Sequence, residues 1–353
     1  MNATPSRSDI SQARKTSLLI LVLILVLVPA IFWALLWGSV RYSFGELFEA
    51  VRVLLERTEN SGVSNLAALI LFEIRLPRLI LALAVGASLA VSGAAFQGIF
   101  RNSLADPYVI GTSSGAALGA CIAIVSGLPQ TGTLSPVSLC AFAGALGAVA
   151  LVFVISRAVG NPPPTVALLL AGTALGTLFS AALSLIQVLR DRDIHRVFYW
   201  LQGSLNGTTW PVLPTAVAVM ALGCLIVFLS GRNLDLLLQG EEVAESLGVD
   251  VKKARFIAAL GASLAVAAAV SVTGIIGFVG LIAPHSVRVI TGPAHRRLLP
   301  AAALAGALIL VIADMITRSI AGVELPIGII TSAGGAPFFI YILARYGKNL
   351  GRF

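Results

Sequence analysis

The chain has 353 residues, of which 58% are hydrophobic and only 11% are charged. Soluble globular proteins carry about 25% charged residues. In this chain long runs have no charged residue, such as 17–39 and 79–100. Each run is at least as long as the roughly 20 apolar residues that span a bilayer. This composition excludes a cytosolic enzyme, a secreted disulfide scaffold and a disordered segment, and it predicts an all-α polytopic membrane protein. We assign the net charge of +8 to basic residues in cytoplasmic loops, and we expect no nucleic-acid partner.

Uncharged runs predict ten transmembrane helices. In chain order they cover residues 17–37, 79–100, 107–128, 135–156, 164–187, 211–230, 256–275, 277–287, 299–316 and 325–344. The first run is too long for a signal peptide and has no small-residue cleavage site after it. The eighth run is short, so we expect the chain to break near Gly274 and Gly277 and to cross the membrane as one full helix followed by a shorter one.

The basic residues predict how these helices are oriented. An even number of spans puts both termini on one side. With that side in the cytoplasm, 15 of the 24 Lys and Arg residues lie inside and 9 lie outside, and every Lys is inside. The positive-inside rule therefore favours cytoplasmic tails at residues 1–16 and 345–353. We treat residues 1–353 as a single transmembrane domain in contact with membrane lipid.

Two small-residue patterns indicate how the helices pack. The hexapeptide Gly86-Ala-Ser-Leu-Ala-Val91 recurs letter for letter at residues 261–266. In the topology above, the two copies run in opposite directions, which is typical of an inverted repeat in a transporter. Gly111, Gly115 and Gly119 form a second pattern, a row of small residues four apart that lets helix backbones approach closely.

Few residues in the predicted spans have charged or metal-binding side chains. Asp314 is the one carboxylate well inside a run, and Arg318 follows at the (i, i+4) spacing of a helical ion pair. An intramembrane charge is a candidate functional residue, and the alternative is that the local pair only neutralises Asp314. The three cysteines fit neither a disulfide framework nor a zinc site, so we expect no metal site.

The segment 231–255 is the longest cytoplasmic loop and predicts a short amphipathic helix. Glu241 and Glu242 suit the positive end of a helix dipole, and Gly248 suits its termination. Such a short helix is marginal alone, so it either packs beneath its own membrane domain or docks into a partner's groove. The chain has no phosphate-binding loop, because its one Gly-Lys pair, Gly347-Lys348, lacks the required pattern. ATP hydrolysis would need another subunit.

A set of motifs from residue 75 onward resembles the FecCD-type permeases, the membrane subunits of type II ABC importers for ferric siderophores, haem and cobalamin. The motifs are Arg75-Leu-Pro-Arg78, Gly93-Ala-Ala-Phe-Gln97, Asn102-Ser-Leu-Ala-Asp-Pro107, Gly111-Thr-Ser-Ser-Gly115, Leu168-Leu-Leu-Ala-Gly172, Trp200-Leu-Gln-Gly-Ser-Leu205, Gly240-Glu-Glu242, Leu247-Gly-Val249, Gly277-Phe-Val-Gly-Leu-Ile-Ala-Pro-His285, Glu324-Leu-Pro-Ile-Gly328 and Gly335-Ala-Pro-Phe338. Each motif alone is weak, and the set in this order is specific.

The resemblance implies a BtuC-like permease fold in the bacterial inner membrane. It implies a second copy or a close paralogue as partner, two ATP-binding cassette subunits below and one periplasmic substrate-binding protein above. ATP and magnesium would bind to the cassette subunits, so this chain is expected to have no catalytic residues and no cofactor. The expected substrate is a ferric siderophore, followed by haem and then cobalamin.

The resemblance also assigns residues to three sites. Arg75, Arg78 and Arg318 would pair with acidic residues of the binding protein, and the alternative is that they reach lipid headgroups. Coupling to the ATPase is assigned to Gly240, Glu241, Glu242, Ala244, Leu247 and Gly248, and the cytoplasmic gate to Asn102, Leu104, Thr165 and Val166.

Some alternatives stay open. Asn102 and Asp106 also fit ordinary turn and cap positions, and Pro162-Pro-Pro164 stiffens the second gate loop. His195 could contact a haem iron, although a single outer histidine is more often only solvated. Two alternatives come from other functional classes. An ion-coupled secondary transporter would explain the inverted repeat, whereas a membrane scaffold would transport no substrate.

Overall fold

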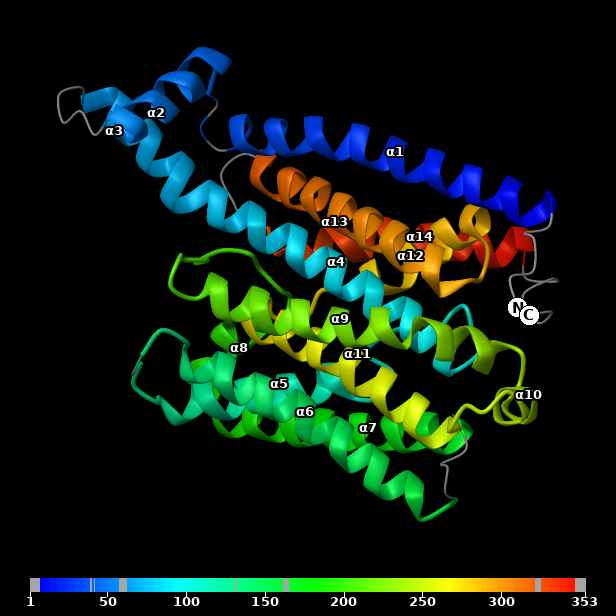
Figure 1. The fold of residues 1–353 in the computed structure, drawn as a ribbon. Coiled ribbons are helices and arrows are strands. Elements are labelled where there is room, and N and C mark those ends of the chain that lie inside the picture. The colour runs from blue at the N-terminus through cyan, green and yellow to red at the C-terminus, as the bar shows by residue number, and fades with distance from the viewer. Residues whose placement is uncertain are drawn as a thin grey trace.

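The computed structural model describes residues 7–38, 40, 42–56, 62–130, 132–160, 165–320 and 325–346. The described part of the chain is built from helices, which Figure 1 labels along a layered bundle. They are α1 (Arg7–Leu36), α2 (Phe44–Glu56), α3 (Gly62–Leu69), a π-helical segment (Ile70–Arg75), α4 (Leu76–Ile99), α5 (Thr112–Ser126), α6 (Pro136–Arg157), α7 (Thr165–Leu189), a 3₁₀ turn (Asp191–Asp193), α8 (Ile194–Leu201), α9 (Leu213–Leu238), α10 (Glu241–Ser246), α11 (Val251–Thr273), α12 (Val279–Thr291), α13 (His295–Ser319) and α14 (Ile327–Tyr346).

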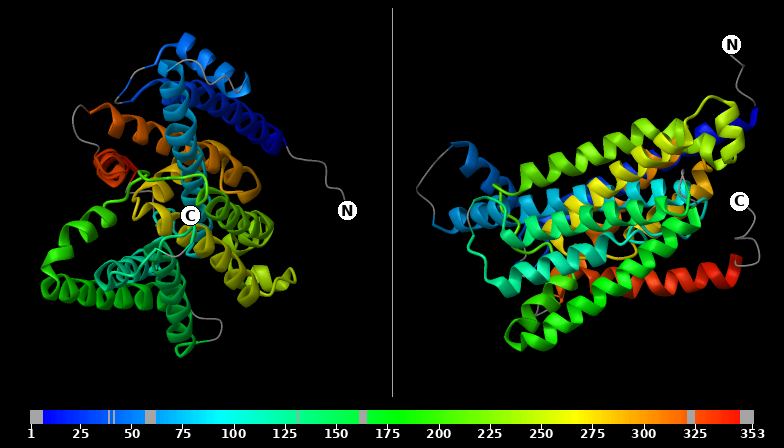
Figure 2. Two further views of the ribbon diagram at one scale, coloured as in Figure 1. Left: turned by 90° about the vertical axis from the view of Figure 1, so that its left-hand side faces the viewer. Right: turned by 90° about the horizontal axis from the view of Figure 1, so that it is seen from below.

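Ten of these helices correspond to the predicted spans. Within the described residues, seven helical stretches are long and apolar enough to cross a membrane: those of α1, α4, α6, α7, α9, α11 and α13. The other three predicted spans are the shorter apolar helices α5, α12 and α14. Figure 2 (right) shows the long helices running side by side, with α10 at one end and α2 and α3 at the other. The end with α10 is the predicted cytoplasmic end, here called the inner end, and the opposite end is called the outer end.

The core is built on α4 and α11, which carry the two copies of the repeated hexapeptide. The two helices are in contact and run in opposite directions, as an inverted repeat predicts. Both are mostly buried, because small side chains let their neighbours approach to backbone contact. A Cβ atom on Gly86 would lie 2.3 Å from the carbonyl oxygen of Gly306 on α13.

The predicted glycine row packs in the same way. On α5, a Cβ atom on Gly115 would lie 2.3 Å from the carbonyl oxygen of Gly144 on α6, and one on Gly119 would lie 2.1 Å from that of Cys140. Helices α5 and α6 therefore meet along their backbones, and any larger side chain at these positions would push them apart.

The chain breaks where the sequence predicts, between α11 and α12. Helix α11 ends at Thr273, and residues 274–278 are not helical. Gly274 has φ +71°, and a Cβ atom there would lie 2.1 Å from the carbonyl oxygen of Trp200, so only glycine fits. The Tyr108 hydroxyl donates to the Ile276 carbonyl at 3.0 Å. Neighbouring segments thus satisfy backbone groups that the break frees inside the bundle.

The outer end contains helices that the uncharged runs did not predict. Helices α2 and α3 and the π-helical segment precede α4, and the short α8 follows α7. A charged capping box begins α2, in which the Glu46 carboxylate accepts a hydrogen bond from the Ser43 backbone N–H at 2.6 Å. Because α2 and α8 are short or charged, a search for long uncharged runs passes over them.

Candidate functional site

The predicted coupling segment forms a compact turn at the inner end. Helix α9 ends at Leu238, Gly240 turns the chain with φ +122°, and α10 begins at Glu241. Gly248, with φ +83°, ends the turn, and both glycines have conformations that other residues rarely adopt. Asp250 then caps α11 by accepting a hydrogen bond from the Lys253 backbone N–H at 3.0 Å. The short glycine-terminated helix predicted from the sequence is confirmed.

One face of α10 is held by the membrane domain and the other is exposed. Ala244 is fully buried, and the Glu241 carboxylate forms an ion pair with Arg255, whose side chain is 4% exposed. On the other face, Val243 is 44% exposed and Leu247 is 61% exposed. Helix α10 is therefore fixed to α11 while it presents two apolar side chains outward.

The carboxylate of Asp250 has a lowered pKa. Its first cause is the hydrogen bond from the Lys253 backbone N–H, and the Lys253 side chain adds to it with an ion pair at 3.2 Å. A similar cause lowers the pKa of Glu46 in the capping box of α2, where the backbone N–H and the hydroxyl of Ser43 donate to its carboxylate. The carboxylates of Asp250 and Glu46 are therefore both ionised at neutral pH.

The first predicted gate loop, residues 100–111, lies between α4 and α5. The Asn102 side chain accepts the Leu104 backbone N–H at 2.9 Å, and Asp106 accepts that of Tyr108 at 2.8 Å. These are turn-forming bonds, as the alternative interpretation of the sequence predicted. Farther along, the loop packs on α7, since a Cβ atom on Gly172 would lie 2.3 Å from the Val109 carbonyl oxygen.

The second predicted gate position is the start of α7. Thr165 is the first residue of that helix, and Val166 is 64% exposed. Pro162-Pro-Pro164 lies outside the described residues. The gate roles of Asn102, Leu104, Thr165 and Val166 stay predictions.

Sequence reasoning missed a polar cluster between the coupling segment and the gate loop. His295 begins α13 and is fully buried, and its backbone N–H and its ring Nδ1 each lie 2.7 Å from the Asp235 Oδ1 atom on α9. Nearby, the Arg288 guanidinium on α12 donates to the Gln97 side chain on α4 at 2.8 Å. Partners 60 and 191 residues apart leave no local spacing by which the sequence could reveal them.

The predicted docking arginines lie together at the outer end, and all three are buried. Arg78 Nε lies 2.8 Å from Asp314 Oδ1, and Arg318 Nη2 lies 3.0 Å from Asp314 Oδ2. Arg75 donates to the backbone carbonyls of Leu35 and Val40. The local Asp314–Arg318 pair is confirmed, and the alternative that these arginines reach lipid headgroups is wrong because their partners lie inside the protein. Their pairing with a binding protein stays a prediction.

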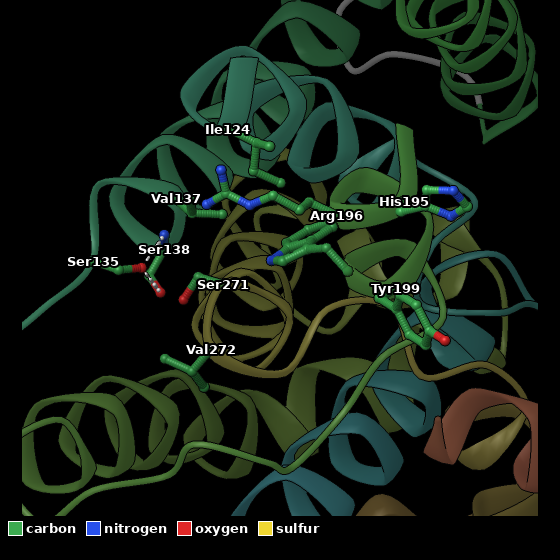
Figure 3. A pocket seen from close by; sticks show the side chains of 10 residues that line it. Ile124, Ser135, Val137, Ser138, His195, Arg196, Tyr199, Ser271 and Val272 are labelled. Carbon is green, nitrogen blue, oxygen red and sulfur yellow. Dashed lines mark hydrogen bonds between the residues drawn. The ribbon is translucent and has the colours of Figure 1, made fainter. Parts of the chain in front are cut away.

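A pocket of about 500 Å³ opens at the outer end between α5, α6, α8 and α11. Figure 3 shows Arg196 extending toward Val137 and Ile124, while the His195 ring lies on the far side of α8 from Ser135 and Ser138. His195 is exposed, so the structure agrees with the solvated alternative. Within the described ranges, no three His, Cys, Asp or Glu side chains are grouped to hold a metal ion. The pocket is lined by Ile124, Ser135, Val137, Ser138, His195, Arg196, Tyr199, Trp200, Ser271 and Val272.

Comparisons with known proteins agree with this arrangement. The profile of the FecCD transport family matches residues 21–345. The chain is 48% identical to the cobalamin import system permease protein BtuC of Halobacterium salinarum, over 80% of this chain and 75% of the relative. It is 40% identical to the hemin transport system permease protein HmuU of Yersinia pestis, over 86% of this chain and 90% of the relative.

A solved structure shows the same fold over nearly the whole chain. It is described as an inward-facing conformation of a metal-chelate type ABC transporter. The two structures superpose with a TM-score of 0.78 at 32% sequence identity, over 92% of this chain and 98% of the solved one. The all-helical permease fold predicted from the sequence is therefore confirmed.

Proposed function

Because the chain belongs to the FecCD transport family, we propose that it is the membrane permease subunit of an ATP-driven importer that moves a metal chelate from a periplasmic binding protein into the cytoplasm. The proposed assembly has two permease chains, two ATP-binding cassette subunits and one binding protein, in the bacterial inner membrane with both termini of this chain cytoplasmic. ATP hydrolysis belongs to the cassette subunits in this proposal.

The observation that carries this proposal is the geometry of α10. A helix of six residues is too short to be stable alone, yet it is fixed to the membrane domain by Glu241 and Arg255 and leaves Val243 and Leu247 exposed. An apolar pair on a fixed cytoplasmic helix suits a groove on a partner protein. An ion-coupled secondary transporter would have no use for such a surface, so the geometry favours the ATP-driven alternative.

The proposed substrate is a ferric siderophore, with haem and cobalamin as alternatives. The similarity to a relative named for cobalamin import supports the cobalamin alternative. The similarity to a relative named for hemin transport supports the haem alternative. In this proposal the binding protein supplies most of the affinity, so the permease needs only a wide path without a tight site.

Uptake in cells that lack this chain tests the proposal. Ferric siderophores, haemin and cyanocobalamin, each labelled, are supplied in parallel, and uptake is compared with and without the restored chain. The double variant Val243→Ala/Leu247→Ala should abolish uptake of the one compound that the wild-type chain restores. The matched control is Val188→Ala/Leu189→Ala, an even more exposed Val and Leu pair at the outer end of α7.

The outcomes separate the alternatives. Uptake that persists when cellular ATP is depleted, and that follows a proton or sodium gradient, would show an ion-coupled carrier. Full uptake by the Val243→Ala/Leu247→Ala variant would contradict the role of α10. Restored uptake of cobalamin or haem in place of a siderophore would keep the mechanism and change the substrate.

A further inference from the structure

Helices α4 and α13 are joined at three levels along their length. At the outer end, Arg78 on α4 forms a buried ion pair with Asp314 on α13. In the middle, Gly86 and Gly306 bring the two backbones into contact. At the inner end, the His295 ring of α13 lies against α4, with Nε2 3.4 Å from the Ala94 carbonyl oxygen. The two helices are therefore held together along their whole length.

The inner end of this pair is bound to the helix that leads into the coupling segment. Asp235 lies in the last turn of α9, five residues before Gly240. Its carboxylate accepts the His295 backbone N–H at the start of α13, where the helix dipole favours a negative charge, and it also holds the His295 ring nitrogen. A carboxylate only accepts hydrogen bonds, so the Nδ1 atom of the ring donates this one.

The His295 ring is fully buried and lies against a glycine of α4. A Cβ atom on Gly98 would lie 2.6 Å from His295 Nε2, so the absence of a side chain on α4 creates the space that the ring fills. Closely packed protein interiors shift between discrete arrangements and do not deform gradually. A displacement of α9 would therefore press directly on α13 and α4.

The far side of α4 leads to the predicted gate loop. Gln97 accepts a hydrogen bond from Arg288 on α12 and donates to the Leu281 carbonyl at 3.3 Å. The loop 100–111 begins three residues after Gln97, and the Asn102 backbone N–H donates to the Gln97 carbonyl at 3.1 Å. A continuous set of contacts thus runs from α10 through Asp235, His295 and α4 to Asn102.

We propose that Asp235 and His295 are positioning residues that transmit the movement of the coupling helix α10 to the α4–α13 pair and through it to the gate loop 100–111. This inference rests on the proposed function, because it needs a cassette subunit that moves α10. Neither residue contacts substrate or ATP in this mechanism. Energetic coupling differs from mere contact, and the measurement therefore separates transmission from stability.

The experiment uses proteoliposomes that hold the permease with its cassette subunits, and purified binding protein loaded with a ferric siderophore, haemin or cyanocobalamin in parallel. Two quantities are measured: the ATPase rate with and without loaded binding protein, and uptake. The variants are Asp235→Asn, which keeps an acceptor and removes the charge, His295→Gln and the conservative Asp235→Glu. The control is Glu46→Gln, which alters a carboxylate that also caps a helix, but at the outer end.

We expect Asp235→Asn and His295→Gln to assemble and to keep their basal ATPase rate, while stimulation by the binding protein falls at least about fivefold, the lower end of typical coupling between linked sites. Uptake should fall in parallel, Asp235→Glu should recover most of it, and Glu46→Gln should behave as wild type. Unchanged stimulation in either assembled variant would overturn the inference, and so would failure of both to assemble, which would show a purely structural role. A wild-type complex without uptake or stimulation for any compound would instead overturn the proposed function itself.

Discussion

Arg78 on α4 and Asp314 on α13 form a buried ion pair between residues 236 positions apart, with Arg78 Nε 2.8 Å from Asp314 Oδ1. Asp314 also binds Arg318, one turn later on its own helix. This arrangement accounts for Arg78 and Arg318 at the predicted outer end, where topology disfavours positive charge. Any binding protein that pairs with Arg78 would compete with Asp314 for the same guanidinium group.

Asp314→Ala should strongly destabilise the protein. It would leave Arg78 and Arg318 buried without this carboxylate, and loss of one partner of a buried pair typically costs about 3–5 kcal/mol. The measurement is the thermal unfolding midpoint of the purified permease in detergent. The control is Asp193→Asn, which alters a contact of 3.8 Å with the exposed Arg196 side chain and should leave the midpoint nearly unchanged. Equal midpoints for the two variants would show that Asp314 contributes little.

Two glycines on α6 offer a matched test of helix packing. Gly144→Ala should lower the unfolding midpoint and the yield, because the new Cβ would lie 2.2 Å from the Gly115 backbone oxygen and the helices cannot separate without losing contacts. Gly147→Ala adds the same methyl group to the same helix where nothing lies within 4 Å. It should be neutral or stabilising by up to about 1 kcal/mol, the helix preference of Ala over Gly. A destabilising Gly147→Ala would contradict this packing.

Arg255→Gln should weaken binding of the cassette subunits. Without the ion pair to Glu241, α10 loses a fixed orientation, and the exposed Val243 and Leu247 no longer present one surface. The measurement is the amount of cassette subunit retained on affinity-tagged permease. Lys253→Gln is the control, because Lys253 is exposed and pairs only locally with Asp250. Full retention by Arg255→Gln would mean that packing of Ala244 alone holds α10.

Local sequence patterns were sufficient for the ten predicted spans and for the short helix of the coupling segment. Uncharged length predicts the spans, and glycines at positive φ mark both ends of α10 and the break after α11. These signals lie within a few residues of the structure they specify. For the same reason Asp314 and Arg318 were paired correctly, since (i, i+4) neighbours share a helix face.

Contacts between distant segments were beyond sequence reasoning. Nothing local connects Arg78 to Asp314 or Asp235 to His295, because each partner is brought close only by the packing of α4, α9 and α13. Arg75 and Arg78 were therefore interpreted from the family resemblance and from their outer position, neither of which reveals burial. The gate residues differ in kind, because a gate is defined by movement between two conformations, which no local sequence pattern encodes.

The cap of α11 gives a prediction for pH. The pKa of Asp250 lies below its usual value of 3.8, chiefly through the hydrogen bond from the Lys253 backbone N–H. A carboxylate whose pKa is lowered by folding stabilises the folded state above the unfolded value, and this contribution is lost as the pH falls through the lower folded-state value. Hydrogen exchange in the first turn of α11, corrected for its intrinsic rate, should therefore be equally slow from pH 5 to pH 8 and should accelerate below about pH 4. Asp250→Ala should exchange fast throughout, and a pH-independent difference between wild type and Asp250→Asn would show that charge plays no part in the cap.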